Sequence, residues 1–198
     1  MQALILAAGF GIRLREIIHG RPKHLAPING QPFLRYLIRL LNKNGIDQCV
    51  ISIGYLAQYI IDEFKFNTEG VKLIFSEDDR PLGTAGSLKA AQKYFSSNFF
   101  VINGDTYLDI NYSDLYKAHI DNHKIATIVI NQDLVSCGVY VFSPKIFSLI
   151  SDKEKSSLEK DIFPKLKQKN QLNFFSTTRQ FIDIGTPAGY QKALTILK

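Results

Sequence analysis

Residues 4–27, LILAAGFGIRLREIIHGRPKHLAP, decide the fold of this chain. The stretch opens with a short apolar run that predicts a buried strand, and a glycine-rich turn with Gly9 and Gly11 follows. Such a turn exposes a row of backbone N–H groups, which forms a concave site for anions. Arg13 adds a planar five-donor guanidinium and Lys23 a compact ammonium. Together these groups favour a polyphosphate as the ligand.

Three interpretations of the turn compete. It could be a tight strand-to-helix connection in which glycine only supplies a positive φ. A Rossmann dinucleotide site requires a third glycine where Leu14 stands, so that fingerprint fails. A Walker A loop fails as well, because no G-K-[ST] is present.

The remaining interpretation takes the whole run as one signature. LAAGxGxRL, then Pro22-Lys23, Leu25-x-Pro27 and Gly30-x-Pro32, resembles the N-terminal signature of the sugar-1-phosphate nucleotidylyltransferases. The resemblance implies that Arg13 and Lys23 are catalytic and hold the phosphates of a nucleoside triphosphate. It also implies that the loop backbone binds the nucleotide at Leu6, Ala7, Ala8, Gly9 and Gly11.

Length and composition predict one domain of 198 residues, with a nucleotide-binding half at 1–110 and a sugar-phosphate and metal half at 111–198. The net charge of +6 favours anionic partners, but Lys and Arg are scattered, so we expect no nucleic-acid binding. Cys49 and Cys137 stand far apart in apolar surroundings, which indicates a reduced compartment. No apolar run is long enough to span a membrane, and a cytoplasmic location is expected. A homo-oligomer is left open.

Apolar runs alternate with helical patterns along the chain. This rhythm predicts an α/β fold, and the resemblance implies a Rossmann-like three-layer sandwich with a mixed, mostly parallel sheet of the nucleotide-diphospho-sugar transferase type. Ligands in such folds bind at the carboxyl ends of the strands. The expected strands are 2–7, 49–53, 71–75, 98–102, 124–130 and 135–142, with 171–176 and 179–182 paired to each other; the main expected helices are 32–44, 57–64, 84–95 and 112–122.

The motif PLGTAG, residues 81–86, leads into the expected helix 84–95. On its own it predicts a loop with Thr84 as the helix N-cap. It also resembles the base-binding loop of the family, which implies nucleotide contacts from Pro81, Gly83 and Thr84. Glu77 stands where the family often has an acidic or amide residue near the base or ribose.

Asp105 follows Gly104 at the end of a buried strand, a costly place for a charge unless something binds it. An N-cap or Asx-turn is the simpler alternative. Gly104-Asp105 resembles the metal-binding aspartate motif of the family, and the D-x-G-T-P run at Asp183 resembles its second metal aspartate. The resemblance implies one Mg²⁺ between Asp105 and Asp183.

The run from Ser136 to Phe142, SCGVYVF, resembles the family strand that contacts the sugar, with Gly138 in its glycine position. The family usually carries an excursion before this strand, with a Lys that contacts the sugar phosphate. Only residues 131–134 stand here, so about two dozen residues are missing and no Lys can be assigned that role. We expect a more open sugar pocket, or one closed by another loop or a second chain.

The implied reaction joins an NTP and a sugar 1-phosphate into an NDP-sugar and pyrophosphate. We favour GTP and a heptose or mannose 1-phosphate as substrates, because the motif PKxLAPI…PFL resembles the small guanylyltransferases. The product would serve cell-surface polysaccharide synthesis. Two alternatives stay open. One is a cytidylyl- or uridylyltransferase acting on phosphocholine or an amino-sugar phosphate. The other is a non-catalytic nucleotide-binding sensor.

Overall fold

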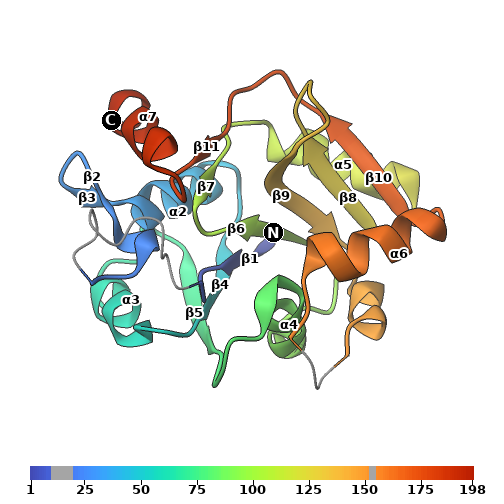
Figure 1. Cartoon of the computed structure of the whole chain (residues 1–198), viewed down its shortest axis with the longest axis horizontal. Helices are drawn as coiled ribbons and strands as arrows, with labels where there is room; N and C mark the ends of the chain where they lie inside the picture. The colour runs from blue at the N-terminus through green and yellow to red at the C-terminus, as the bar shows by residue number, and fades with distance from the viewer. Residues whose placement is uncertain (10–19, 152–154) are drawn as a thin grey trace.

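The computed structural model describes residues 1–9, 20–151 and 155–198. Within these residues a central sheet has seven strands in the order β10-β8-β9-β6-β1-β4-β5 (Figure 1). Neighbouring strands run parallel, except that β9 is antiparallel to both β6 and β8. The predicted mixed, mostly parallel sheet is therefore confirmed. Its strands are β1 (Gln2–Leu6), β4 (Gln48–Ile53), β5 (Lys72–Glu77), β6 (Phe99–Asn103), β8 (Ala126–Ile130), β9 (Ser136–Phe142) and β10 (Leu172–Ser176).

Successive residues of the central strands face opposite sides of the sheet, and both sides are covered. In β1, Ala3 and Ile5 belong to one apolar cluster and Leu4 belongs to another. All three side chains are fully buried. This double burial explains why the strands are apolar runs without an alternating polar face.

Helices cover the two faces of the sheet and complete the predicted three layers (Figure 1). α2, α3 and α5 contribute to the cluster that holds Ile5, whereas α4 and α6 contribute to the cluster that holds Leu4. Short 3₁₀ segments (Gln92–Tyr94 and Pro144–Leu149) and a π-helical turn (Leu158–Ile162) connect these elements. The helices are α2 (Phe33–Lys43), α3 (Ala57–Phe64), α4 (Gly83–Ala90), α5 (Tyr112–Asn122), α6 (Phe163–Gln168) and α7 (Pro187–Ile196).

α7 fastens the end of the chain to the segment that follows the first loop. Its helix begins after Thr186, whose hydroxyl accepts a hydrogen bond from Gly189 N at 3.1 Å. The Tyr190 hydroxyl donates to the carbonyl of Pro27 at 2.6 Å, in the short hairpin of β2 (Pro27–Ile28) and β3 (Gln31–Pro32). The C-terminal helix thus braces the chain next to the 3₁₀ turn Lys23–Leu25, which carries a predicted catalytic lysine.

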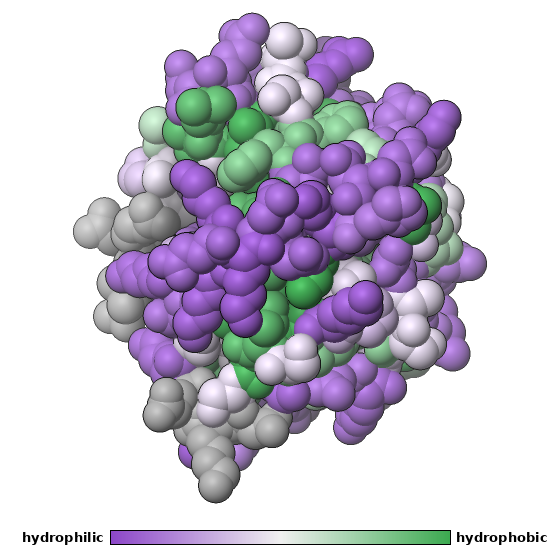
Figure 2. Space-filling model, turned by 90° about the vertical axis from the view of Figure 1, so that its right-hand side faces the viewer, coloured by the Kyte–Doolittle hydropathy of each residue, from purple (hydrophilic) through white to green (hydrophobic). Residues whose placement is uncertain are grey.

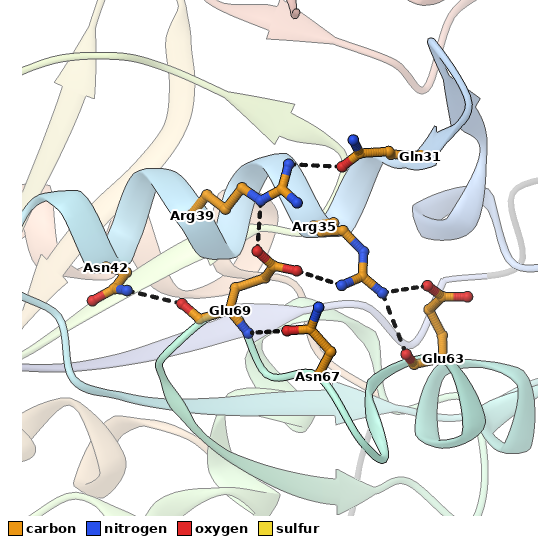
Figure 3. A network of polar contacts seen from close by, with 7 residues as sticks. All are labelled: Gln31, Arg35, Arg39, Asn42, Glu63, Asn67 and Glu69. Carbon is orange, nitrogen blue, oxygen red and sulfur yellow. Dashed lines mark hydrogen bonds and ion pairs between the residues drawn. The ribbon is translucent and has the colours of Figure 1, made fainter.

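An ion-pair network joins α2 to the segment between α3 and β5 (Figure 3). Arg35 of α2 pairs with Glu63 at 2.6 Å and with Glu69, and Arg39 pairs with Glu69 at 2.6 Å. The Glu69 side chain is only 10% exposed, and the Arg35 guanidinium also lies over the Phe64 ring. The network therefore fixes the outer helix layer at the β5 edge of the sheet.

One predicted strand pairing is wrong. Residues 171–176 do form a strand, β10, but it pairs parallel with β8. The expected partner at 179–182 contributes only to β11 (Ile182–Asp183), which pairs antiparallel with β7 (Thr106–Tyr107).

Figure 2 views the molecule from the side on which β10 lies, where hydrophilic side chains cover much of the face between apolar patches. Such polar cover is typical of an edge strand that avoids pairing with other chains.

Cys49 and Cys137 are buried and not joined by a disulfide, as predicted. Among the described residues, none of the helices combines the length and the hydrophobicity that crossing a bilayer requires.

Candidate active site

Residues 7–9, directly after β1, lie beside the ends of two neighbouring strands. Ala7 N donates to the carbonyl of Ser52 at the end of β4, and Gly104 N donates to the carbonyl of Leu6, both at 2.9 Å. These bonds bring the segments after β1 and β6 together at the carboxyl edge of the sheet. The geometry matches the place where open α/β sheets bind ligands.

A cavity of about 290 Å³ opens at this edge. Eight of the predicted site residues line it, drawn from the first loop, the PLGTAG motif and the end of β6. They are Leu6, Ala8, Gly9, Lys23, Pro81, Gly83, Thr84 and Asp105. Residues that the sequence did not single out also line it: His24, Leu82, Ser87, Asn103 and Lys155. Three distant parts of the chain therefore meet at one cavity.

Lys23 and Asp105 form an ion pair on the wall of the cavity. Their side chains are 16% and 17% exposed, respectively. Burial by itself would raise the pKa of the Asp105 carboxyl, but the charge and hydrogen bond of Lys23 outweigh it and hold that pKa below its usual value. The site therefore contains an anionic oxygen and a cation within contact of each other.

Asp183 is brought next to Asp105 by a short antiparallel ladder. It pairs with Thr106 across β11 and β7, and Ile184 N donates to the carbonyl of Asp105 at 2.9 Å. One Asp183 oxygen accepts from Gly185 N at 2.8 Å, and the side chain is not part of the cavity wall. Two carboxylates on neighbouring strands supply the hard oxygen ligands that a divalent cation prefers.

Gly104 allows the close approach that builds this corner. A Cβ at that position would lie 2.8 Å from the Leu6 carbonyl oxygen and 2.9 Å from Cδ2 of His24. His24 is itself 1% exposed, and neither ring nitrogen has a hydrogen-bond partner within the described part of the chain. Burial, reinforced by the charge of Lys23, lowers the pKa of His24 to about 3, so its ring is neutral at ordinary pH. No sequence pattern indicates this arrangement, because it depends on the packing of His24 against Gly104.

A second hollow of about 380 Å³ adjoins the first and shares Ala8 and Pro81 with it. Glu77 lines this hollow and is exposed. The adjacent Asp78, which the sequence did not single out, also lines it and is 8% exposed. Ser87 and Ser52 donate to one Asp78 oxygen, the latter at 3.4 Å, while Oδ1 has no partner among the described residues. Burial raises the pKa of the Asp78 carboxyl, and the serine hydrogen bonds only partly oppose this.

The prediction that Thr84 caps α4 is wrong. The helix begins after Leu82, and the carbonyl of Ser156 accepts from Ala85 N at 3.0 Å. The Thr84 hydroxyl instead donates to Glu159 at 3.1 Å and accepts from Leu158 N at 2.8 Å. A residue far along the chain thus accepts the helix amide that a local cap would have bound, and these contacts anchor the PLGTAG motif to the second half of the chain.

The connection between β8 and β9 is a tight hairpin, as predicted. Asn131 N donates to the carbonyl of Val135 at 3.0 Å and Leu134 N donates to the carbonyl of Asn131 at 3.1 Å. Gly138, which follows, has φ +68°, and a Cβ there would lie 2.7 Å from Oγ1 of Thr106. Gly138 therefore lets β9 lie close against the segment after Asp105.

The predicted residues Gly11 and Arg13 lie outside the described residues. His119 Nδ1 lies 2.9 Å from Oγ1 of Thr127, and His123 is the residue at which α5 ends. Within the described residues, no three His, Cys, Asp or Glu side chains cluster closely enough to hold a metal ion.

A sequence profile of the nucleotidyl transferase family matches residues 2–133. The chain belongs to this family. The predictions of the family and of a nucleotidyltransferase enzyme are thereby confirmed. The matched region ends inside the short β8–β9 hairpin, where the family resemblance predicted a deletion.

Characterised nucleotidyltransferases resemble the chain over nearly its full length. A D-glycero-alpha-D-manno-heptose 1-phosphate guanylyltransferase from Aneurinibacillus thermoaerophilus is 33% identical over 222 aligned positions, which cover 98% of this chain and 96% of that protein. The enzyme of the same name from Campylobacter jejuni is 32% identical, with 96% and 97% covered. Because 222 positions exceed the 198 residues present, the first relative has at least 24 residues without a counterpart here.

Solved structures of nucleotidyltransferases share the fold. HddC from Yersinia pseudotuberculosis, crystallised in complex with GMP-PN, superposes with a TM-score of 0.85 at 32% identity, covering 100% of this chain and 99% of that one. A putative glucose-1-phosphate thymidylyltransferase from Bacillus anthracis reaches the same TM-score at 19% identity, covering 99% and 94%. The predicted nucleotide-diphospho-sugar transferase architecture is therefore confirmed.

Proposed function

We propose that this nucleotidyltransferase transfers a guanylyl group from GTP to a heptose or mannose 1-phosphate and releases pyrophosphate, with Mg²⁺ held by Asp105 and Asp183. The observation that carries the proposal is the cavity in which Lys23, Asp105 and the PLGTAG motif meet at the strand ends. The full-length similarity to heptose 1-phosphate guanylyltransferases supports the choice of substrates. GDP-sugars of this kind serve cell-surface polysaccharides.

The reaction needs positioning and charge neutralisation more than acid–base chemistry. A sugar phosphate oxygen attacks the α-phosphorus of the nucleotide, and the bond from that phosphorus to the bridging oxygen breaks, so pyrophosphate leaves. A bound cation would neutralise charge on the two reacting phosphates. Lys23 would contact the α-phosphate once it leaves Asp105, and Arg13 with the amides of Gly9 and Gly11 would hold the departing pyrophosphate.

The buried carboxylate of Asp78 supports guanine as the base of the nucleotide substrate. The Watson–Crick edge of guanine presents two adjacent N–H donors, and a carboxylate offers two acceptor oxygens. Asp78 Oδ1 is a buried acceptor without a partner among the described residues, and the side chain borders the hollow that adjoins the cavity. An unmatched buried acceptor costs about 1–3 kcal/mol, which a ligand N–H would recover.

A pyrophosphate-release assay with GTP, ATP, CTP and UTP against a panel of sugar 1-phosphates tests this proposal. The panel includes heptose, mannose and glucose 1-phosphates together with phosphocholine, and the product is identified by mass spectrometry. We expect the fastest release with GTP and a heptose or mannose 1-phosphate. Faster pyrophosphate release with CTP or UTP would show instead that the protein is a cytidylyl- or uridylyltransferase.

One observation favours a second candidate, a non-catalytic nucleotide sensor. The β8–β9 hairpin leaves no room for the excursion that carries the sugar-phosphate lysine in the family. A sensor would bind GTP and release no pyrophosphate with any acceptor of the panel. Equilibrium binding of GTP, measured beside the assay, separates this outcome from a chain that binds nothing.

A further inference from the structure

A third hollow, of about 470 Å³, lies at the opposite end of the sheet from the candidate active site. Its walls come from the chain just before β8 and β10 and just after β9, and from the last turn of α5 (on the right of Figure 1). Backbone bonds join these walls: Ser143 N donates to the carbonyl of Ile125 at 2.9 Å, and Ala126 N to the carbonyl of Gln171 at 3.2 Å. The hollow is therefore framed by paired backbone and not by free loops.

This hollow is separate from the catalytic cavity. β6 and β8 run in the same direction, because each is antiparallel to β9. The catalytic cavity lies at the carboxyl end of β6, whereas Asn98, before the start of β6, lines the hollow. A strand of five residues spans about 16 Å, so a ligand in one place does not touch the other.

The charge of the hollow has one sign. Lys124 and Lys145 line it together with His123, and no Asp or Glu of the described part of the chain belongs to its wall. Neither lysine forms an ion pair with an acidic side chain of the described residues, and Lys124 Nζ is held by the carbonyl of Asn170 at 2.7 Å. Two lysines that line one hollow without an acidic partner repel each other, so an anion bound between them is favoured.

A buried hydroxyl points to the same conclusion. Ser143 Oγ is buried and has no hydrogen-bond partner within the described residues, although Ser143 stands directly before a 3₁₀ helix that its side chain does not cap. A buried hydroxyl of this kind costs about 1–3 kcal/mol unless something pairs with it. The amide of Gln171 and the ring of His119 complete the polar wall.

We propose that this hollow is a binding site for the phosphate group of a small molecule. Two lysines, a serine hydroxyl and an amide offer more donors than the two oxygens of a carboxylate can accept, whereas a phosphate presents three or four oxygens. The volume lies within the range of about 300–1,000 Å³ in which small-molecule sites fall, so a phosphorylated metabolite fits as well as inorganic phosphate.

Tungstate, which scatters X-rays anomalously and resembles phosphate, locates the site directly. Crystals of the full chain soaked in tungstate should show an anomalous peak between Lys124 and Lys145. The variant Lys124→Gln/Lys145→Gln should lose this peak. The variant Lys117→Gln/Lys165→Gln, which removes two exposed lysines of α5 and α6 outside the hollow, should keep it. A wild-type crystal with no peak in the hollow would overturn the proposal.

Calorimetric titration in solution excludes an ion that binds only at crystal concentration. Inorganic phosphate and glucose 1-phosphate are each titrated into the wild type and both variants. We expect the Lys124→Gln/Lys145→Gln variant to lose one binding site or to bind at least tenfold more weakly than the Lys117→Gln/Lys165→Gln variant. The ligand with the larger difference identifies free phosphate or a phosphate ester as the occupant. Equal binding by the two variants would refute the site.

Discussion

Lys23 and Asp105, which are 82 positions apart in the sequence, hold each other in an ion pair at the carboxyl edge of the sheet. The proposed reaction needs the two groups separately, the carboxylate for a cation and the ammonium for a phosphate. A metal ion that binds Asp105, as proposed, would therefore compete with Lys23 for this carboxylate. It follows that binding a cation at Asp105 and releasing Lys23 toward the nucleotide are coupled events.

The competition predicts that Lys23→Met binds Mn²⁺ more tightly than the wild type. Removing the ammonium leaves Asp105 without its present partner, and we expect affinity to rise about tenfold, which corresponds to about 1.4 kcal/mol. Titration followed by the electron paramagnetic resonance of free Mn²⁺ measures this without any turnover. Lys155→Met removes another lysine of the same cavity that is not paired with Asp105, so it controls for net charge. Equal affinities in the two variants would show that the ion pair does not restrain the metal.

Asp105→Asn should lower pyrophosphate release by about 100- to 1,000-fold, the size of effect seen when one electrostatic contact to a transition state is removed. The amide keeps the shape of the side chain but supplies no charge for a cation or for Lys23. Asp109→Asn alters an exposed carboxylate four residues away and should retain near-normal turnover. Thermal unfolding is measured for both, because a large drop in melting temperature would assign the loss to folding.

Asp78→Asn should lower kcat/KM for GTP by about 10²- to 10⁴-fold and narrow the preference for GTP over ATP, because a buried donor replaces an acceptor. The measurement is pyrophosphate release with each nucleotide at saturating sugar phosphate. Glu77→Gln changes an exposed carboxylate that lines the same hollow and serves as the control. An unchanged GTP-to-ATP ratio in Asp78→Asn would remove this residue from base recognition.

The sequence predicted those features that short apolar runs and local motifs determine. β4 and α3 fall within one residue of their expected bounds, because burial on both faces of a strand and a helical apolar stripe are local patterns. Lys23 and Asp105 were identified from motifs, and their meeting follows from the rule that ligands bind at strand ends. The roles assigned to Lys23 and Asp105 stay predictions, as do those of Gly11 and Arg13.

The errors have a common physical cause, which is a partner supplied from far along the chain. Thr84 is a good N-cap by type, but its hydroxyl is bound to Glu159 and Leu158, and the Ser156 carbonyl accepts from the amides of Ala85 and Gly86. The parallel pairing of β10 with β8 leaves no signal in either strand alone. Asp78 carries no motif, and its burial depends on Ser52 and Ser87 from two other elements.

Gly83→Ala should destabilise the chain more than Gly30→Ala does. Both glycines have a positive φ, +75° and +82°, so an alanine at either position pays about 1–2 kcal/mol in backbone strain. At Gly83 a Cβ would also lie 2.4 Å from the Ser156 carbonyl oxygen, whereas nothing lies within 4 Å at Gly30. The difference between the two variants in urea unfolding measures the steric contribution to the loss of stability. Similar losses of stability in both variants would mean that the segment at Ser156 moves aside freely.

Glu69→Gln should lower the free energy of unfolding at neutral pH and have a smaller effect in acid. Burial alone would raise the pKa of the Glu69 carboxyl, but hydrogen bonds and charge from Arg39 and Arg35 hold it below its usual 4.5. A carboxyl whose folded pKa is depressed contributes stability above its unfolded pKa and loses it as pH falls through the folded value. The side chain is 10% exposed, so we expect a loss of about 1–2 kcal/mol at pH 7, between the values for surface and buried pairs.

Urea unfolding at pH 7 and at several values below pH 4.5 measures this difference. The difference in the free energy of unfolding between wild type and Glu69→Gln should shrink steadily once the pH drops below 4.5. The wild-type carboxyl then takes up its proton, and both proteins carry a neutral group at position 69. Asp62→Asn changes an exposed carboxylate of α3 that accepts a hydrogen bond from the neutral Gln58, and its stability should differ little from that of the wild type at any pH. A gap for Glu69→Gln that stays constant down to pH 2 would mean that its effect comes from shape and not from the charge that joins α2 to the segment before β5.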